Sequence, residues 1–350
     1  MAAGPLEEGP FNAMGLRKPF YPVGDALREY LMHHGRHVAL PLRYDDLRRY
    51  DGLMPTLDAK GKETLWNTVL YRPSDLEGLH EQLVETYQLL IADGRPIEHL
   101  RVAGIDFCAY GNSQPFRIKI LNQINDNHAY YYIKRTDASR IYGLELEHLL
   151  SPNRINYMCH GGTLVEEHII GVPGDTFMQE PERYGAHLSP VRLSKEFVKF
   201  NERCFARLLG DMRAYNFVVD VIQDFDQVQY RLRSIDFDQQ SYDGRHRIYL
   251  PQFYKENLPF VEFAQQYISY ETAAQYSNEE RALLRKRYLL AQSQIEALIA
   301  VMKDDVVSTE EHVAMLAREL SVFHGDVEMG RCRSMGAVLE RHLALRLELR

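Results

Sequence analysis

The stretches GDMRAYN (210–216) and SIDFD (234–238) decide the fold of this chain. The first follows a segment with helical spacing and precedes a run rich in valine, so we expect it to form a loop between a helix and a strand. Asp211 and Asn216 lie five residues apart in this loop, and Asp236 comes twenty residues later at the end of a second strand. Carboxylate and amide oxygens are ligands that Mg²⁺ accepts in proteins, so these three residues are candidates for a functional site.

Upstream of these stretches, residues 99–134 hold three β-like runs that are separated by the turn-rich sequences GNSQ and NDN. This pattern predicts a three-stranded antiparallel meander. A helix is expected next at 138–150, because Asp137 can cap its N-terminus and the apolar positions recur at helical spacing. Two more strands are expected at about 155–159 and 163–170.

Downstream, residues 194–209 form an expected helix, and strands are expected at 217–222 and 229–237. From about residue 256 onward the pattern is almost entirely helical. The order of strands and helices predicts the α+β fold class. A small antiparallel sheet lobe with one helix would be joined to a larger helical lobe, which is a bilobal architecture.

We divide the chain into four parts on these patterns. Residues 1–22 contain four prolines and three glycines and predict a flexible arm. Residues 23–98 are expected to be an N-terminal helical extension, because the segment 79–91 places apolar residues on one face of a helix. The small lobe would span 99–170 and the helical lobe 171–350.

Composition narrows the possible partners and locations. The 350 residues are 45% hydrophobic and 26% charged, which is typical of a soluble globular protein. Acidic residues (49) outnumber basic ones (41), so nucleic acid is not the expected partner. Four scattered cysteines do not form a zinc motif. No apolar run is long enough to span a membrane, so we expect a cytoplasmic protein.

The two stretches together resemble the GDxxxxN…IDF/W pattern of the aminoglycoside-phosphotransferase branch of the protein-kinase-like superfamily. They are similar, less closely, to the HRDxxxxN…DFG pattern of protein kinases. The resemblance covers roughly residues 99–260. It implies ATP and Mg²⁺ as cofactors, and transfer of a phosphoryl group to a hydroxyl of a protein or a small molecule. It also implies that Asp211 is the catalytic carboxylate and that Asn216 and Asp236 bind Mg²⁺. Arg213 stands where many protein kinases have a lysine that neutralises the transferring phosphate.

Lys134 ends the third strand of the predicted meander, where this resemblance implies a cation for the ATP phosphates. The same architecture requires a glutamate on the following helix to hold that lysine. Glu145 and Glu147 are both candidates. Glu145 falls within the apolar sector of the helix, and a buried carboxylate needs a partner. We therefore prefer Glu145 and leave Glu147 open.

The remaining positions of the site carry weaker signals. Gly111 lies in the first hairpin, in the position of the loop that covers the nucleotide, although a plain hairpin turn is an equal alternative. His168 and Ile170 lie at the end of a predicted strand that would lead into the hinge between the lobes. Their backbone groups would contact the adenine edge, and a strand with a polar end is the alternative.

Two departures from the family pattern favour a second interpretation. Leu209 stands where the usual histidine would precede Asp211 by two residues, and no glycine follows Phe237. A pseudokinase that binds a nucleotide or a protein partner without turnover therefore remains the alternative. A third class, a helical interaction protein with a small sheet, would make the motif accidental.

Overall fold

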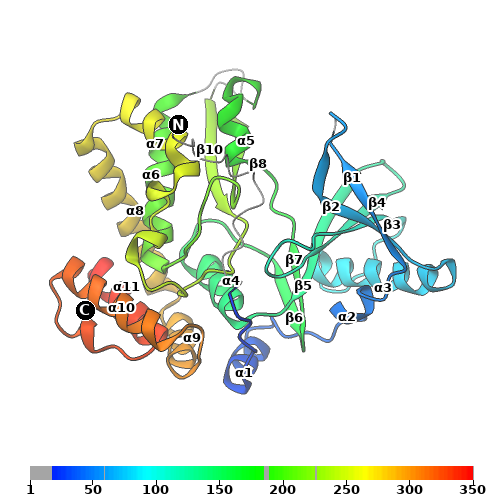
Figure 1. Cartoon of the computed structure of the whole chain (residues 1–350), viewed down its shortest axis with the longest axis horizontal. Helices are drawn as coiled ribbons and strands as arrows, with labels where there is room; N and C mark the ends of the chain where they lie inside the picture. Colours follow the sequence, from blue (N-terminus) through cyan, green and yellow to red (C-terminus); the bar gives the residue numbers. More distant parts are fainter. Residues whose placement is uncertain (1–17, 59, 185–188, 225–226, 350) are drawn as a thin grey trace, which may run out of the picture.

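The computed structural model describes residues 18–349, except 59, 185–188 and 225–226. Most of the predicted arm (1–22) therefore lies outside the described residues. The chain has the expected α+β class, with a seven-stranded antiparallel sheet followed by a helical C-terminal region (Figure 1). We call the sheet with the two helices α2 and α3 the sheet lobe, and residues 171–349 the helical lobe.

The sheet has the strand order β1-β2-β3-β4-β5-β7-β6. The predicted meander, helix and strand pair are all confirmed. Their bounds are β3 Leu100–Phe107, β4 Phe116–Asn122, β5 His128–Arg135, α4 Ala138–Leu150, β6 Tyr157–His160 and β7 Thr163–Glu167. The side chain of Asp137 caps α4 by accepting a hydrogen bond from the backbone N–H of Arg140, as the sequence predicted.

The predicted helical extension at 23–98 is only partly helical. Three helices occur there, α1 Asp25–His33, α2 Tyr44–Leu47 and α3 Pro73–Ala92, but the hairpin β1 Gly52–Leu57 and β2 Glu63–Leu70 lies between them. Strand β2 pairs with β3, so the hairpin extends the sheet beyond the predicted boundary at residue 99. The β-branched and aromatic residues of ETLWNTVL explain the strand, because they pack well on a pleated surface.

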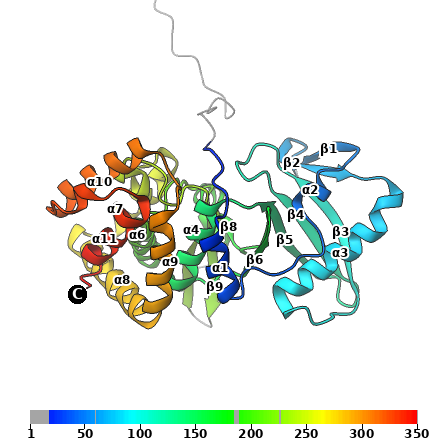
Figure 2. The same ribbon diagram turned by 90° about the horizontal axis from the view of Figure 1, so that it is seen from below.

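The two faces of the sheet differ because side chains alternate along each strand. One face is apolar and packs against α2 and α3. On this face the Tyr131 hydroxyl donates to the Leu83 carbonyl of α3 at 2.7 Å, and Ile118 and Ile133 are fully buried. The opposite face carries the polar residues Tyr132 and Lys134 of β5. Figure 2 shows α3 running alongside the sheet, away from the helical lobe.

The helical lobe contains a second sheet of three strands, with the order β10-β9-β8. Its elements include β8 Val172–Pro173, α5 Gly174–Gln179, α6 Pro190–Arg207, β9 Phe217–Asp224 and β10 Gln227–Ser234. The later helices are α7 Leu258–Tyr267, α8 Tyr270–Leu290, α9 Gln292–Asp304, α10 Glu310–His324 and α11 Met335–Arg346. Across the described ranges, no helix is long and apolar enough to cross a membrane.

Helix α4 lies between the large sheet and the helical lobe (Figure 1). Its apolar side chains belong to the core of the helical lobe, which also includes Leu27 and Leu31 of α1. Gly143 lets α4 approach the chain after β10, because a Cβ at this position would lie 3.0 Å from the Cβ of Phe237. The close approach places the first turn of α4 beside Asp236 and Asp238, the acidic residues of the SIDFD stretch.

Candidate functional site

The loop that begins at Leu208 turns sharply after α6. Leu208 and Asp211 both have left-handed backbone conformations, with φ of 53° and 56°. Gly210 between them donates its N–H to the Gln239 carbonyl at 3.2 Å. A Cβ on Gly210 would lie 3.1 Å from that carbonyl oxygen and 3.1 Å from a methyl group of Ile248. The glycine therefore allows the loop to pack against two later segments of the chain.

Asp211 is fixed by contacts on both its backbone and its side chain. Its N–H donates to the Tyr254 hydroxyl at 3.0 Å, and its Oδ1 accepts from Arg213 Nε at 2.7 Å. Arg213 also donates to Glu256 at 2.8 Å. Burial raises the pKa of Asp211, while the hydrogen bond and charge of Arg213 oppose this rise. The carboxylate is still one-third exposed, so it can contact a ligand.

Asn216 connects this loop to Asp236. Its Nδ2 donates to the Asp211 carbonyl at 2.7 Å, and its own carbonyl accepts from the N–H of Ile235 at 3.0 Å. The antiparallel pairing of Phe217 with the last residue of β10 fixes this register. The structure therefore brings together the three residues on which the sequence argument relied.

Asp236 is held by a cation from α4. Its Oδ1 accepts from Arg140 Nη1 at 2.8 Å and from the backbone N–H of Asp238 at 3.1 Å. The same Arg140 nitrogen donates to Asp238 Oδ1 at 2.8 Å. Burial and the neighbouring Asp236 raise the pKa of Asp238, and Arg140 opposes this rise. Arg140 thus sits between both carboxylates of the SIDFD stretch and the sheet.

Lys134 is buried and pairs with a residue on the neighbouring strand β7. Its Nζ lies 2.7 Å from Oε2 of Glu166, and Arg140 donates to both oxygens of the same carboxylate. Burial opposes ionisation of Glu166, yet Arg140 and Lys134 together lower its pKa to about 2. Burial and the charge of Arg140 lower the pKa of Lys134, while Glu166 opposes this change. Lys134 is therefore connected to Asp236 by a chain of ion pairs through Glu166 and Arg140.

The predicted pairing of Glu145 with Lys134 is wrong. Glu145 is buried, as expected, but it accepts hydrogen bonds from the hydroxyls of Tyr30 and Tyr157 at 3.1 and 2.7 Å and from Arg36 Nε at 3.1 Å. Glu147 is not the partner either, because it pairs with Arg207. The end of β5 faces the first turn of α4, and a residue five positions further along a helix lies about 7.5 Å away along the axis.

Sequence reasoning missed Arg140 and Glu166, the two residues that complete the charged network. Arg140 is 1% exposed and Glu166 is 4% exposed. Arg140 lies in the predicted helix, and Glu166 lies in the predicted strand that contains TLVEE. A charged residue at a buried position needs an opposite charge nearby. This requirement was the available sequence signal that Arg140 and Glu166 have charged partners.

Gly111 lies in the loop 108–115 between β3 and β4, as predicted. This loop packs against α2, because the Tyr44 hydroxyl donates to the Gln114 carbonyl at 2.9 Å. The Ser113 carbonyl accepts from the N–H of Arg135, the residue after Lys134, at 3.4 Å. The loop therefore lies beside the strand end that carries Lys134.

His168 and Ile170 lie in the connection between β7 and β8, which joins the two lobes. His168 Nδ1 is 3.1 Å from the Tyr132 hydroxyl, so this ring lies on the polar face of the sheet. Ile170 is 73% exposed. Gly171 has a φ of 157°, and a Cβ there would lie 2.7 Å from Val218. The chain can enter the helical lobe at this point because residue 171 has no side chain.

Aromatic rings and cations cover the polar face of the sheet next to Lys134. The guanidinium of Arg117 lies 4.4 Å from the ring centre of Trp66 and 5.7 Å from that of Tyr130. Arg117 also donates to Asp106 at 2.7 Å. Lys134 Nζ is 5.3 Å from the ring centre of Tyr132. Trp66 comes from the hairpin that sequence analysis missed, so this face was not foreseen.

The donor set near Asp236 fits Mg²⁺. Within the described ranges, no hydrogen bond uses Asn216 Oδ1 or Asp236 Oδ2, so both oxygens are available. No group of three or more His, Cys, Asp or Glu suited to a metal occurs in the part of the chain that the structure describes. Protein Mg²⁺ sites often use only one or two carboxylates together with water and substrate phosphates. Asn216 and Asp236 thus offer oxygen ligands of the types that such sites use.

No protein-family model matches this chain, and no curated protein has significant sequence similarity to it. Function must therefore be argued from the residues themselves. A cavity of about 1100 Å³ lies in the helical lobe, apart from the residues discussed so far. The charged network is the candidate site, because its carboxylate and amide oxygens can bind a metal ion and its cations can bind an anion.

Proposed function

We propose that this chain is an ATP- and Mg²⁺-dependent phosphotransferase with a bilobal, protein-kinase-like fold. The observation that supports it is the continuous set of contacts from Lys134 to Asp236, and from there to the loop with Asp211 and Asn216. Phosphoryl transfer requires a cation for the phosphates, oxygen ligands for Mg²⁺ and a carboxylate for the acceptor hydroxyl. These groups come from both lobes, which agrees with a nucleotide bound between a sheet and a helical region.

Each residue has one role in this proposal. Mg-ATP supplies the phosphoryl group and the charge of the metal. Lys134 binds the α- and β-phosphates, and Asn216 and Asp236 bind Mg²⁺ through their available oxygens. Asp211 accepts a hydrogen bond from the acceptor hydroxyl, and Arg213 offsets negative charge during transfer. The acceptor is an alcohol group of a protein or a small molecule.

Incubation with γ-labelled ATP and Mg²⁺ tests this proposal, with a cell extract as the source of acceptors. Wild-type protein should transfer label, and Asp211→Asn should transfer about 10²–10⁴-fold less, because the variant loses the carboxylate that orients the hydroxyl. Asp93→Asn is the matched control, since Asp93 is exposed and has a left-handed φ of 49° that asparagine also tolerates. Equal transfer by wild type and Asp211→Asn would overturn the assignment of Asp211.

The ion pair between Asp211 and Arg213 favours a second candidate function. Arg213 already occupies one oxygen of the carboxylate and is itself held by Glu256. A chain that keeps this arrangement would bind Mg-ATP without transferring phosphate, which is a pseudokinase. Thermal unfolding distinguishes the two candidates when it is combined with the labelling assay. Stabilisation by Mg-ATP without transfer supports the pseudokinase, and the absence of any stabilisation contradicts both functions.

A further inference from the structure

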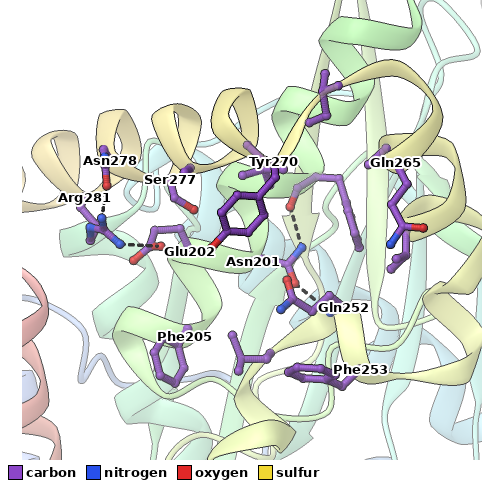
Figure 3. Close-up of a pocket in the computed structure, with 18 of the residues that line it drawn as sticks. Asn201, Glu202, Phe205, Gln252, Phe253, Gln265, Tyr270, Ser277, Asn278 and Arg281 are labelled. Carbon is purple, nitrogen blue, oxygen red and sulfur yellow. Dashed lines mark hydrogen bonds and ion pairs between the residues drawn. The ribbon is translucent and has the colours of Figure 1, made fainter. Parts of the chain in front are cut away.

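The helical lobe contains a cavity of about 1100 Å³ that the proposed reaction does not use. Residues of α6, α7 and α8 line it, together with residues from 246–253, Phe323 of α10 and Arg346 of α11. Figure 3 shows the ring of Tyr270 of α8 directed toward Glu202 of α6, and Tyr270 is 86% exposed, so it lies at the open side of this space. Pockets for small molecules commonly measure about 300–1,000 Å³, so the space is sufficient for a ligand of that size.

The cavity is separate from Asp211, because the segment 246–254 lies between them. Ile248 of this segment approaches Gly210, and the Tyr254 hydroxyl accepts from the N–H of Asp211. Gln252 and Phe253 instead line the cavity. A molecule in the cavity therefore cannot reach the catalytic carboxylate directly, and the cavity is not the acceptor site of the proposed reaction.

Polar and apolar side chains both line the cavity, and the apolar ones include aromatic rings. Four phenylalanines line it, together with aliphatic side chains from all three helices. They are Phe197, Phe205, Phe253 and Phe323. The buried amide of Asn201 is already used, because its Nδ2 donates to the Phe197 carbonyl and its Oδ1 accepts from the Gln252 N–H. A hydrocarbon chain could lie against these rings without leaving a buried polar group unpaired.

The residues that line the cavity carry an excess of positive charge, although the whole chain has a net charge of −8. Three arginines line the cavity, Arg247, Arg281 and Arg346, against one acidic residue, Glu202. Arg346 holds both oxygens of Glu202 at 2.7 and 2.6 Å, while Arg281 lies 3.5 Å from the same carboxylate. One carboxylate thus neutralises only one of two adjacent guanidiniums. Arg281 is the less tightly paired with Glu202, and its Nη2 donates to the neutral Asn278 Oδ1. Figure 3 shows Arg281 between Glu202 and Asn278.

We propose that this cavity binds a long-chain carboxylate, with the carboxylate on Arg281 and the hydrocarbon chain against the phenylalanines. A guanidinium can hold a carboxylate through two parallel hydrogen bonds, and this geometry adds specificity to the charge attraction. A hydrophobic cation cannot accept these hydrogen bonds, and the net positive charge of the cavity lining repels it. The cavity therefore distinguishes amphipathic molecules by the sign of their head group.

Isothermal titration calorimetry with three ligands of equal chain length tests the proposal. They are sodium dodecanoate, dodecan-1-ol and dodecylammonium chloride, each below the concentration at which it aggregates. Dodecanoate should bind at one saturable site, dodecanol about tenfold or more weakly, and dodecylammonium not detectably. Binding of all three with equal affinity would mean non-specific adsorption and would overturn the proposal, as would no binding of dodecanoate.

Two charge-matched variants of α8 locate the site. Arg281→Gln should weaken dodecanoate binding about tenfold or more and leave dodecanol binding unchanged. Lys286→Gln removes the same charge from an exposed position on the same helix and should change neither affinity. Ala274→Phe, which places a ring in the cavity, should abolish binding of both ligands while the thermal unfolding transition remains cooperative. Unchanged dodecanoate affinity in Arg281→Gln and Ala274→Phe would place the ligand elsewhere and contradict the proposal.

Discussion

Glu166 holds two buried cations with a single carboxylate. Lys134 and Arg140 both contact it, and Arg140 extends the network to Asp236. Burial of these groups is costly in isolation, so the network depends on each charge having a partner. Lys134 is also the cation we assign to the ATP phosphates. Its present partner, Glu166, keeps that ammonium group beside the polar face of the sheet.

Replacing Glu166 should therefore affect both stability and nucleotide binding. Glu166→Gln leaves Lys134 and Arg140 with less compensating charge, and we expect the free energy of unfolding to fall by about 3–5 kcal/mol. Urea denaturation measures this change. Glu167→Gln, at the neighbouring and more exposed position, is the control and should change stability by about 0.5 kcal/mol or less. Similar stability of the two variants would show that the network contributes little.

We expect His342 to make the helical lobe sensitive to acid. Its Nε2 lies 2.9 Å from the Phe205 carbonyl, which can only accept, so Nε2 carries the hydrogen. Its Nδ1 then accepts from Nε2 of His324 at 3.0 Å. This arrangement requires neutral His342, and burial, together with His324 and Arg346, lowers the pKa of His342 to about 3.

The sign of the pH effect follows from this lowered pKa. Unfolded histidine has a pKa of about 6.5, so below that pH the unfolded state binds more protons than the folded state. The contribution of His342 to stability is present above pH about 6.5 and is lost as the pH falls toward about 3, by up to about 1.4 kcal/mol per pH unit. Urea midpoints across this range should fall less steeply in His342→Gln than in wild type. Parallel profiles would contradict this account.

Among the elements, the hairpin β1–β2 has the clearest effect on the candidate site. It places Trp66, the single tryptophan of the chain, beside Arg117 on the face that carries Lys134. Sequence analysis predicted β3–β7 and α4 because each has strong local periodicity and clear turns. It missed the hairpin because the flanking segments, α1 and α3, have strong helical patterns.

The position of Trp66 gives a direct test of nucleotide binding. Tryptophan emission, excited selectively, should change in intensity or wavelength and reach saturation as Mg-ATP is added, because the nucleotide would lie near the ring. Trp66→Phe should lose this signal but keep its thermal stabilisation by Mg-ATP. If Mg-ATP stabilises the protein while Trp66 emission stays constant, the nucleotide lies away from the polar face of the sheet.

At the scale of the whole molecule, two apolar cores lie on either side of β6 and β7, which contribute Leu164 to one core and Val165 to the other. The geometry of Asp211, Asn216 and Asp236 could be predicted because a tight loop and one hairpin set it, and both are local in sequence. The partner of Lys134 could not be predicted, because Glu166 lies 32 residues away in the sequence and the pairing of β5 with β7 determines the contact. Hydrophobic periodicity indicates which side of a helix or strand is buried, but it does not indicate which residues of other elements contact that side.

The segment 246–254 is a shared wall, with Asp211 on one side and the cavity on the other. Suppose a cavity ligand binds one arrangement of this wall more tightly than another, and the same arrangements differ in how they hold Asp211. Thermodynamic linkage then requires each ligand to change the affinity of the other by the same factor. Nucleotide affinity measured with and without dodecanoate, and dodecanoate affinity measured with and without nucleotide, must therefore give one common coupling constant.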